Sequence, residues 1–194
     1  MKSKYLKLIM LITLTNLSFA KSSWVSKFDL NDKVTTTPKI VAATGTIEVA
    51  FSPHGGATNS IVNAINQAKQ SILVAAYSFT SKDISKALVD AKNRGIDVQI
   101  ILDKSQAKAG YSSARFFANH QIPLRIDHVH AIFHDKFMVI DGVNVITGSF
   151  NFTNAAENKN AENLLILRGN KELANLYIAN WKSNWQKADP YSLN

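Results

Sequence analysis

Residues 134–151 read HDKFMVIDGVNVITGSFN, and the fold of the surrounding chain depends on this stretch. Two apolar runs, residues 137–140 and 143–146, are separated by the dipeptide Asp141-Gly142. Short apolar runs are typical of buried strands, and an Asp-Gly dipeptide between them is a strong signal for a tight β-hairpin. The stretch therefore predicts two neighbouring strands joined by a short turn.

Reactive side chains flank these two runs at a spacing of two residues. His134 and Lys136 begin the stretch, and Ser149 and Asn151 end it. Residues i and i+2 of a strand project from one face, ~6–7 Å apart, so an imidazole and an ammonium can reach one phosphate there. A hydroxyl and an amide can serve its nonbridging oxygens. Asp141 lies at the turn, an odd number of residues from His134, and we expect it to stabilise the turn or an interface rather than react.

Written as a pattern, the stretch is His-x-Lys-x4-Asp-x6-Gly-Ser-x-Asn. It resembles the signature of the phospholipase D superfamily and matches it at each defining position, Gly148 included. Residues 76–80, 148–153 and 160–163 are similar to the small, single-motif bacterial endonucleases of that superfamily, and the resemblance covers roughly residues 45–190. It implies a phospholipase D/nuclease-like fold and a phosphodiester hydrolase.

The chemistry of a phosphodiester favours His134 as the nucleophile. A neutral imidazole approaches the anion without charge repulsion and can form a phosphohistidine. One ring nitrogen must then be free while the other donates a hydrogen bond to a carboxylate, a role that the resemblance gives to Glu162. Lys136, Ser149 and Asn151 would bind the phosphate and neutralise the transition state by preorganised electrostatics, so we expect no metal and no other cofactor.

The leaving oxygen needs a proton, which calls for a second, protonated histidine. The motif occurs once, and the rest of the chain is too short for a second such domain. We therefore expect a homodimer in which two copies of His134 face each other across a two-fold axis, one as nucleophile and one as acid. One active site per dimer follows.

Alternating strand and helix patterns extend over residues 45–190, the expected phosphodiesterase domain. This order favours an α/β fold with a mixed, mostly parallel β-sheet and helices on both faces. Residues 103–113 are expected to form a loop. The expected strands are residues 46–51, 72–77, 98–102, 124–126, 137–140, 143–146 and 164–167, and the expected helices are residues 61–68, 84–91, 114–119 and 173–185.

The amino-terminal 20 residues are built like a secretory signal peptide. Three lysines precede an apolar run at residues 8–14, and small residues lead to Ala20. The run is short for a membrane span of about 20 residues, although an uncleaved anchor is the alternative. Residues 21–44 are rich in Ser, Thr and Lys and are expected to form a linker or a loosely docked arm. We therefore expect an exported protein, periplasmic or secreted.

Composition sets limits on the remaining possibilities. The chain has 194 residues, of which 46% are hydrophobic, and this is enough for one globular domain with a proper core. It contains no cysteine, which excludes disulfides, thiolate metal sites and thiol nucleophiles. The net charge is +8, but residues 1–44 hold seven Lys and two Asp, which leaves only +3 for residues 45–194. Net charge alone is therefore weak evidence for nucleic-acid binding.

Several histidines and aromatic residues have two interpretations. The pattern His128-x-His130-x3-His134 could be a zinc site, but histidines lining a substrate cleft are the favoured interpretation. His54 either borders the site or belongs to a turn. Aromatic residues could stack on a nucleobase or form the dimer interface, but core positions are favoured for them. The aromatic residues in question are Tyr77, Phe79, Trp181 and Trp185.

The motif recognises the phosphate and not the groups that the phosphate joins. The endonuclease-like flanks favour a nonspecific endonuclease that acts on DNA, with RNA as a second substrate. The alternative is a phospholipase D that hydrolyses phosphatidylcholine-type phospholipids. A noncatalytic phosphate-binding protein is disfavoured because all reactive positions are present, and Ser149 is disfavoured as a nucleophile because no Gly-x-Ser-x-Gly elbow surrounds it.

Overall fold

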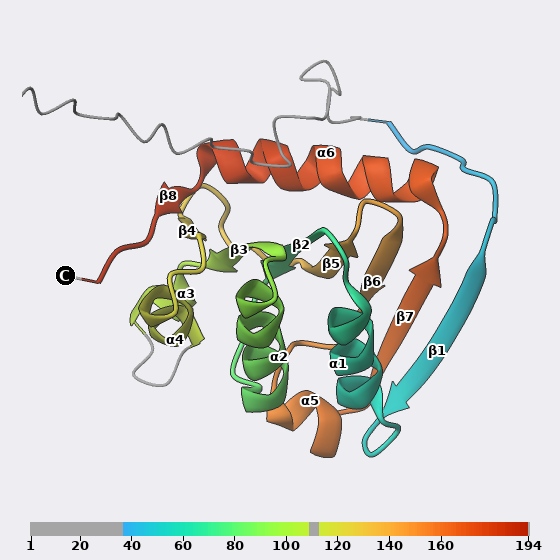
Figure 1. Ribbon diagram of the computed structural model, residues 1–194, viewed down its shortest axis with the longest axis horizontal. Helices are drawn as coiled ribbons and strands as arrows, with labels where there is room; N and C mark the ends of the chain where they lie inside the picture. Colours follow the sequence, from blue (N-terminus) through green and yellow to red (C-terminus); the bar gives the residue numbers. More distant parts are fainter. Residues whose placement is uncertain (1–36, 109–112, 194) are drawn as a thin grey trace, which may run out of the picture.

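The computed structural model describes residues 37–108 and 113–193, which form a three-layer α/β fold (Figure 1). The expected signal peptide and most of the expected arm lie outside the described residues. The strands are β1 Thr46–Ser52, β2 Ser71–Ala76, β3 Asp97–Asp103, β4 Leu124–Asp127, β5 Lys136–Ile140, β6 Asn144–Gly148, β7 Glu162–Arg168 and β8 Asp189–Pro190. The helices are α1 Ala57–Gln67, α2 Lys82–Asn93, α3 Ser105–Lys108, α4 Ser113–Asn119, α5 Asn154–Asn158 and α6 Lys171–Lys187.

The described strands form one mixed sheet in the order β1-β7-β6-β5-β2-β3-β4-β8. The expectation of a mostly parallel sheet is wrong, because only β2–β3 and β3–β4 are parallel pairs. The other pairs, β1–β7, β7–β6, β6–β5, β5–β2 and β4–β8, are antiparallel. The turn at residues 141–143 explains the β5–β6 pair, since so short a connection can join only antiparallel neighbours. The physical reason for the rest is long-range pairing: β7 and the β5–β6 hairpin lie between β1 and β2, which the β-α-β pattern suggested as neighbours.

Helices cover both faces of the sheet, as expected. In Figure 1, α6 runs along the top of the view and α1 and α2 lie below it, with β2 and β3 between them. Side chains of β2 alternate between the two layers: Ile72 and Val74 belong to the core under α1 and α2, and Leu73 belongs to the core under α6. Every residue of β2 is consequently buried, which is typical of a strand with both faces covered.

Trp181 fixes α6 to the centre of this sheet. Its side chain is wholly buried, and its indole Nε1 donates a hydrogen bond to the Val74 carbonyl over 2.8 Å. The ring stacks on Trp185 with centroids 4.7 Å apart. The core interpretation of Trp181 is therefore confirmed.

Three short elements were not expected from the sequence. Residues 103–113 contain α3, which begins where the Asp103 carboxylate accepts a hydrogen bond from the Ser105 N–H over 2.8 Å. The connection between β6 and β7 contains α5, and the two-residue β8 pairs with β4. Elements of two to five residues are too short to produce a recognisable hydrophobic period.

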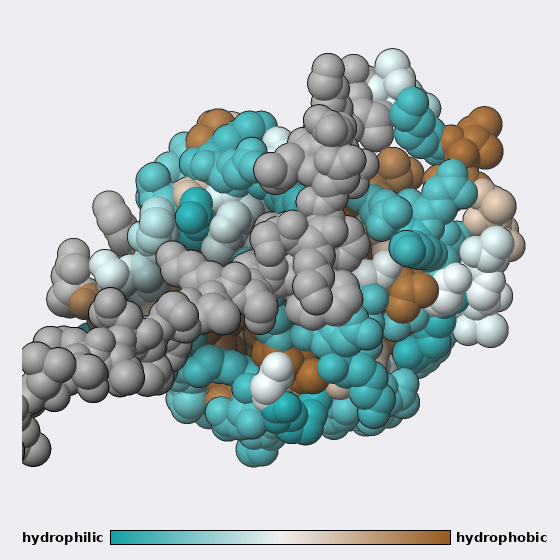
Figure 2. All heavy atoms as spheres, turned by 45° about the horizontal axis from the view of Figure 1, so that its top comes forward, coloured by the Kyte–Doolittle hydropathy of each residue, from teal (hydrophilic) through white to brown (hydrophobic). Residues whose placement is uncertain are grey.

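Polar residues cover most of the surface seen in Figure 2, with separate apolar patches. Three exposed apolar side chains lie on the edge strand β1, at Ile47, Val49 and Phe51. None of the helices in the described part of the chain has both the length and the apolar composition needed to cross a membrane.

Candidate active site

One edge of the sheet brings the motif residues together. Strands β2 and β6 end there, and β5 and β7 begin there, because β5 and β7 run in the opposite direction. We call this the catalytic edge. Tyr77 follows β2, Lys136 begins β5, Ser149 follows β6 and Glu162 begins β7, while His134 lies two residues before β5.

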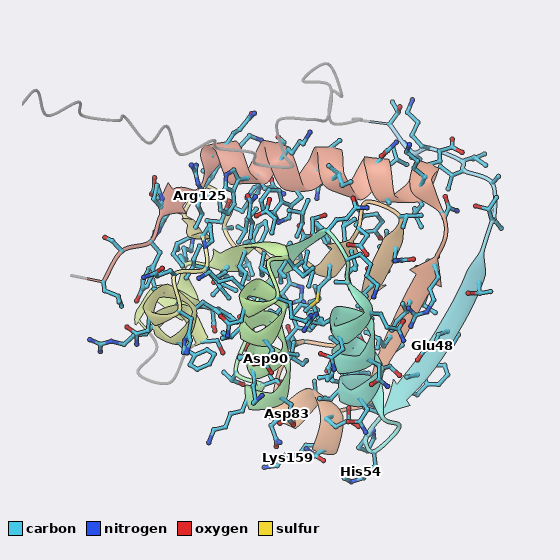
Figure 3. All side chains as sticks on the ribbon, in the orientation of Figure 1. Glu48, His54, Asp83, Asp90, Arg125 and Lys159 are labelled. Atoms are coloured by element: carbon cyan, nitrogen blue, oxygen red, sulfur yellow. The ribbon has the colours of Figure 1, made fainter. Side chains whose placement is uncertain are left out.

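Helix α5 and the N-terminal ends of α1 and α2 lie at the same end of the molecule. Figure 3 labels His54, Asp83 and Lys159 in this region, at the bottom of the view. Strand β1 also ends there, and its last residue, Ser52, pairs with Glu162. The catalytic edge is thus surrounded by loops and helix N-termini, where backbone N–H groups are directed outward.

His134 is exposed at this edge and is held against an aromatic ring. Its imidazole centroid lies 4.7 Å from the Tyr77 ring centroid. Within residues 37–108 and 113–193, no hydrogen bond to the His134 ring is present. The Tyr77 N–H donates to the Asp135 carbonyl over 2.8 Å, which fixes the backbone next to His134. The imidazole is therefore accessible to an incoming phosphate while one side of it is covered by Tyr77.

The aromatic residues near the site divide into two groups. Tyr77 is half-buried at the catalytic edge, in contact with His134. Phe79 is wholly buried and packs on Phe117 and Phe152 at centroid distances of 5.1 and 5.3 Å. The core interpretation is confirmed for Phe79, whereas Tyr77 contributes directly to the site.

Lys136 is almost completely buried, yet its charged end stays beside His134. The ammonium donates to the His134 carbonyl over 2.8 Å and lies 5.4 Å from the Tyr77 ring centroid, within cation–π range. Burial lowers the pKa of the Lys136 ammonium below its ordinary value, while the negative charges of Glu162 and Asp135 oppose this shift. Lys136 therefore supplies a fixed positive charge that depends on neighbouring carboxylates.

The substitution Asp135→Asn is expected to move the alkaline limb of the pH profile of kcat/KM to lower pH. The ammonium is needed for phosphate binding, so activity falls as the pH rises through the pKa of Lys136. Removing the Asp135 charge removes one of the two groups that hold this pKa up. The measurement is kcat/KM against pH for both proteins, with Asp90→Asn, an exposed acid on α2, as the control. An unchanged limb would contradict the assignment to Lys136.

Ser149 and Glu162 form a hydrogen-bonded pair. The Ser149 hydroxyl donates to Glu162 Oε2 over 2.6 Å, and the Asn160 side-chain amide donates to Glu162 Oε1 over 3.0 Å. Ser149 Oγ also accepts from the Asn163 N–H over 3.0 Å. A hydroxyl has one proton to donate, so Ser149 in this arrangement orients Glu162 rather than a phosphate. Both oxygens of the carboxylate are thus fixed.

Gly148 and Asp141 have backbone roles. At Gly148, φ is +152°, and a Cβ atom there would lie 2.2 Å from the Asn163 carbonyl oxygen, so only glycine fits between β6 and β7. The Asp141 carboxylate accepts hydrogen bonds from the backbone N–H groups of residues 69–71, at 2.8 to 3.1 Å. These bonds tie the β5–β6 turn to the start of β2, at the opposite edge from His134.

Asn151 occupies a motif position and is incompletely paired. Its Oδ1 atom is buried and has no hydrogen-bond partner within the described part of the chain. Leaving a buried acceptor unpaired costs about 1–3 kcal/mol, and such groups call for an explanation such as a role in the function. Asn151 is therefore a candidate for contact with a bound substrate.

The remaining histidines do not assemble a metal site. No cluster of three or more potential metal ligands occurs among the residues that the structure places, so the His128, His130 and His134 pattern is not a ligand set there. His130 instead pairs with Asp127, with Nδ1 3.0 and 3.1 Å from the two carboxylate oxygens. His54 is an exposed turn residue with φ of 63°.

Two residues of the site, Asn160 and Asn163, were not predicted from the sequence. Asn160 donates a hydrogen bond to Glu162, and Asn163 donates one to Ser149. The only available signal was their place in the segment 160–163. Asn160 stands two residues before Glu162, and this spacing allows the two side chains to share a face.

Comparisons with known proteins agree with this geometry. A family profile described as "Cardiolipin synthase, PLD-like domain" matches residues 61–185. A phospholipase D of Rickettsia felis is 42% identical over 135 residues, which cover 70% of this chain and 67% of that protein. The mitochondrial cardiolipin hydrolase of Xenopus tropicalis is 28% identical over 141 residues, which cover 72% of this chain and 67% of that protein.

Two solved structures are similar to this chain in fold. Nuc from Salmonella typhimurium, a phospholipase D family member, is 43% identical, with a TM-score of 0.73 over 76% of this chain and 99% of its own. NucT from Helicobacter pylori, at 23% identity and a TM-score of 0.65, covers 75% of this chain and 100% of its own and supports the fold alone.

Proposed function

The chain belongs to the phospholipase D superfamily of phosphodiester hydrolases, and from this premise we propose that it is an exported, metal-independent endonuclease acting on DNA, with RNA as a second substrate. One observation carries the choice of reaction centre. The exposed imidazole of His134 and the ammonium of Lys136 both lie against the Tyr77 ring, and the ammonium also donates a hydrogen bond to the His134 carbonyl.

The proposed reaction has two steps. A free ring nitrogen of His134 attacks phosphorus, so that a P–N bond forms while the P–O bond to the leaving group breaks. The second subunit's copy of this histidine protonates the leaving oxygen. That same group then takes a proton from water, which attacks phosphorus and breaks the P–N bond. Lys136 compensates the charge on the nonbridging oxygens. Glu162, which among the described residues is bonded to Ser149 and Asn160 and not to His134, accepts a hydrogen bond from the His134 ring in the reacting dimer and so fixes the tautomer of the nucleophile.

The dimer and the export are parts of the proposal. A shared site is supported by the single copy of the motif, because one chain supplies one histidine of this kind. Export is supported by residues 1–20, which have the charge and apolar pattern of a signal peptide.

A second candidate activity is hydrolysis of phospholipids by the same chemistry. This candidate is supported by similarity to two relatives, a phospholipase D of Rickettsia felis and a mitochondrial cardiolipin hydrolase of Xenopus tropicalis. The nuclease-like segments at residues 76–80, 148–153 and 160–163 favour nucleic acid.

Incubation of the protein with EDTA is expected to leave nicking of plasmid DNA unchanged, because the charge of Lys136 and the side-chain amide of Asn151 serve the phosphate in place of a metal. The protein is expected to release no choline from phosphatidylcholine vesicles under the same conditions. The His134→Asn variant, purified in parallel, controls for contaminating nucleases. Choline release without DNA nicking would contradict the endonuclease and establish the lipid substrate, and loss of nicking in EDTA would contradict the metal-independent mechanism.

A further inference from the structure

The connection between β4 and β5 crosses the catalytic edge. Strands β2 and β3 lie between β4 and β5 in the sheet, so residues 128–135 must pass over the ends of both. This segment is hydrogen-bonded at the end of β4, from which it starts, and at the ends of β3 and β2, which it crosses. These bonds join the His130 N–H to Asp127 Oδ1 (3.0 Å) at β4, the Phe133 N–H to Asp103 Oδ2 (2.8 Å) at β3, and the Tyr77 N–H to the Asp135 carbonyl (2.8 Å) after β2.

His130 is held in one orientation by a buried carboxylate. Asp127 is completely buried at the end of β4, and both of its oxygens lie within 3.1 Å of His130 Nδ1. The His130 side chain is 43% exposed. Because Nδ1 is used by Asp127, Nε2 is the ring nitrogen left for a ligand.

Lys104 adds a second cationic group beside His130. It follows β3, is exposed, and donates from Nζ to the His130 carbonyl over 3.0 Å. The neighbouring acids are withdrawn from the surface: Asp103 and Asp127 are buried and accept hydrogen bonds from the loop. Asp135 is half-buried against Asn180, and burial raises the pKa of its carboxyl.

Distance decides what this pair of cations can bind. Lys104 directly follows β3, and two strand-to-strand steps separate β3 from β5, which is about 10 Å at ~4.8 Å per step. Because the Lys104 ammonium is bonded to the His130 carbonyl, this pair lies beside the end of β3 and not at Lys136, which begins β5. A polynucleotide strand carries one phosphate per ~3.4 Å of helix axis, so the strand that reacts at His134 has further phosphates at this distance.

We propose that His130 and Lys104 form a second phosphate-binding subsite, which holds a phosphate of the same polynucleotide strand displaced along the catalytic edge from the scissile one. The imidazolium donates from Nδ1 to Asp127 and from Nε2 to the phosphate, and the Lys104 ammonium supplies a second charge. This inference rests on the proposed endonuclease activity. A substrate with a single phosphate cannot occupy both positions.

The test compares two substrates for each of two variants, His130→Gln and Lys104→Met. On a single-stranded DNA oligonucleotide, each variant is expected to raise KM about tenfold, the effect of losing one charge-assisted hydrogen bond. The slope of log(1/KM) against log[salt] should become shallower by ~0.7 for each phosphate that the variant no longer neutralises. On bis(p-nitrophenyl) phosphate, which has one phosphate, kcat/KM should stay at the parental value.

His120→Gln is the matched control, because His120 is an exposed histidine that follows α4, near the other end of β4. Its ring is hydrogen-bonded to the Phe116 carbonyl and packs on the Phe116 ring. Equal losses on both substrates would assign His130 and Lys104 to structure and overturn the subsite. Unchanged KM and salt slope on DNA would also overturn it, with the endonuclease proposal intact. A parent protein that hydrolyses the small diester but leaves DNA uncut would overturn the endonuclease proposal and the subsite together.

Discussion

Replacing His134 with Asn is expected to lower the rate of phosphodiester hydrolysis by at least about 10⁴-fold, because the substitution removes both the nucleophile and the acid of the proposed dimer. The fold should not change. His134 is exposed, and its ring packs on Tyr77. The measurements are kcat/KM on DNA and the urea-induced unfolding transition of both proteins.

Trapping experiments test the covalent step directly. Acid quenching during turnover of labelled DNA should leave a phosphoryl adduct on His134 of the parent and none on the variant. His120→Asn, which alters an exposed histidine distant from the catalytic edge, should retain the parental rate. A parental rate in His134→Asn would contradict the phosphohistidine.

The same variant reports on the shared site. A mixed dimer lacks one of the two imidazoles, so activity in exchanged mixtures should fall with the square of the parent fraction, to about a quarter in an equal mixture. A linear fall would indicate that each subunit works alone.

The sequence predicted the elements of this fold more accurately than their arrangement. The β5–β6 hairpin depends on residues 137–146 alone, so local signals were sufficient. The position of β1 depends on its pairing with β7, where Thr46 lies opposite Arg168. No local pattern records a partner so far along the chain, and the parallel interpretation failed there.

The site shows the same division. The motif predicted that His134 and Lys136 approach one another, because two-residue spacing in an extended chain is a local property. The Ser149–Glu162 hydrogen bond depends on how β6 and β7 are paired, so the sequence suggested a phosphate ligand where the structure has a partner for a carboxylate. The hydrogen bond between Asp127 and His130 was not predicted, because the spacing of the three histidines suggested a zinc site instead.

Replacing Trp181 with Ala is expected to lower the free energy of unfolding by about 3–5 kcal/mol. The side chain is wholly buried between α6 and β2, and its removal leaves a cavity beside Trp185. It also leaves the Val74 carbonyl without its indole donor. Domains of this size are stable by only about 5–15 kcal/mol, so the loss is a large part of the total.

Urea unfolding followed by circular dichroism measures this loss. Trp181→Phe should lie between parent and Trp181→Ala, because it keeps most of the apolar contact but not the N–H. Lys171→Ala, an exposed change in the first turn of α6, should stay within about 0.5 kcal/mol of the parent. Activity should fall with stability, because α6 also supplies Asn180, which hydrogen-bonds the Asp135 side chain next to His134 and Lys136. A Trp181→Ala protein as stable as the parent would contradict the role of this residue as the anchor of α6.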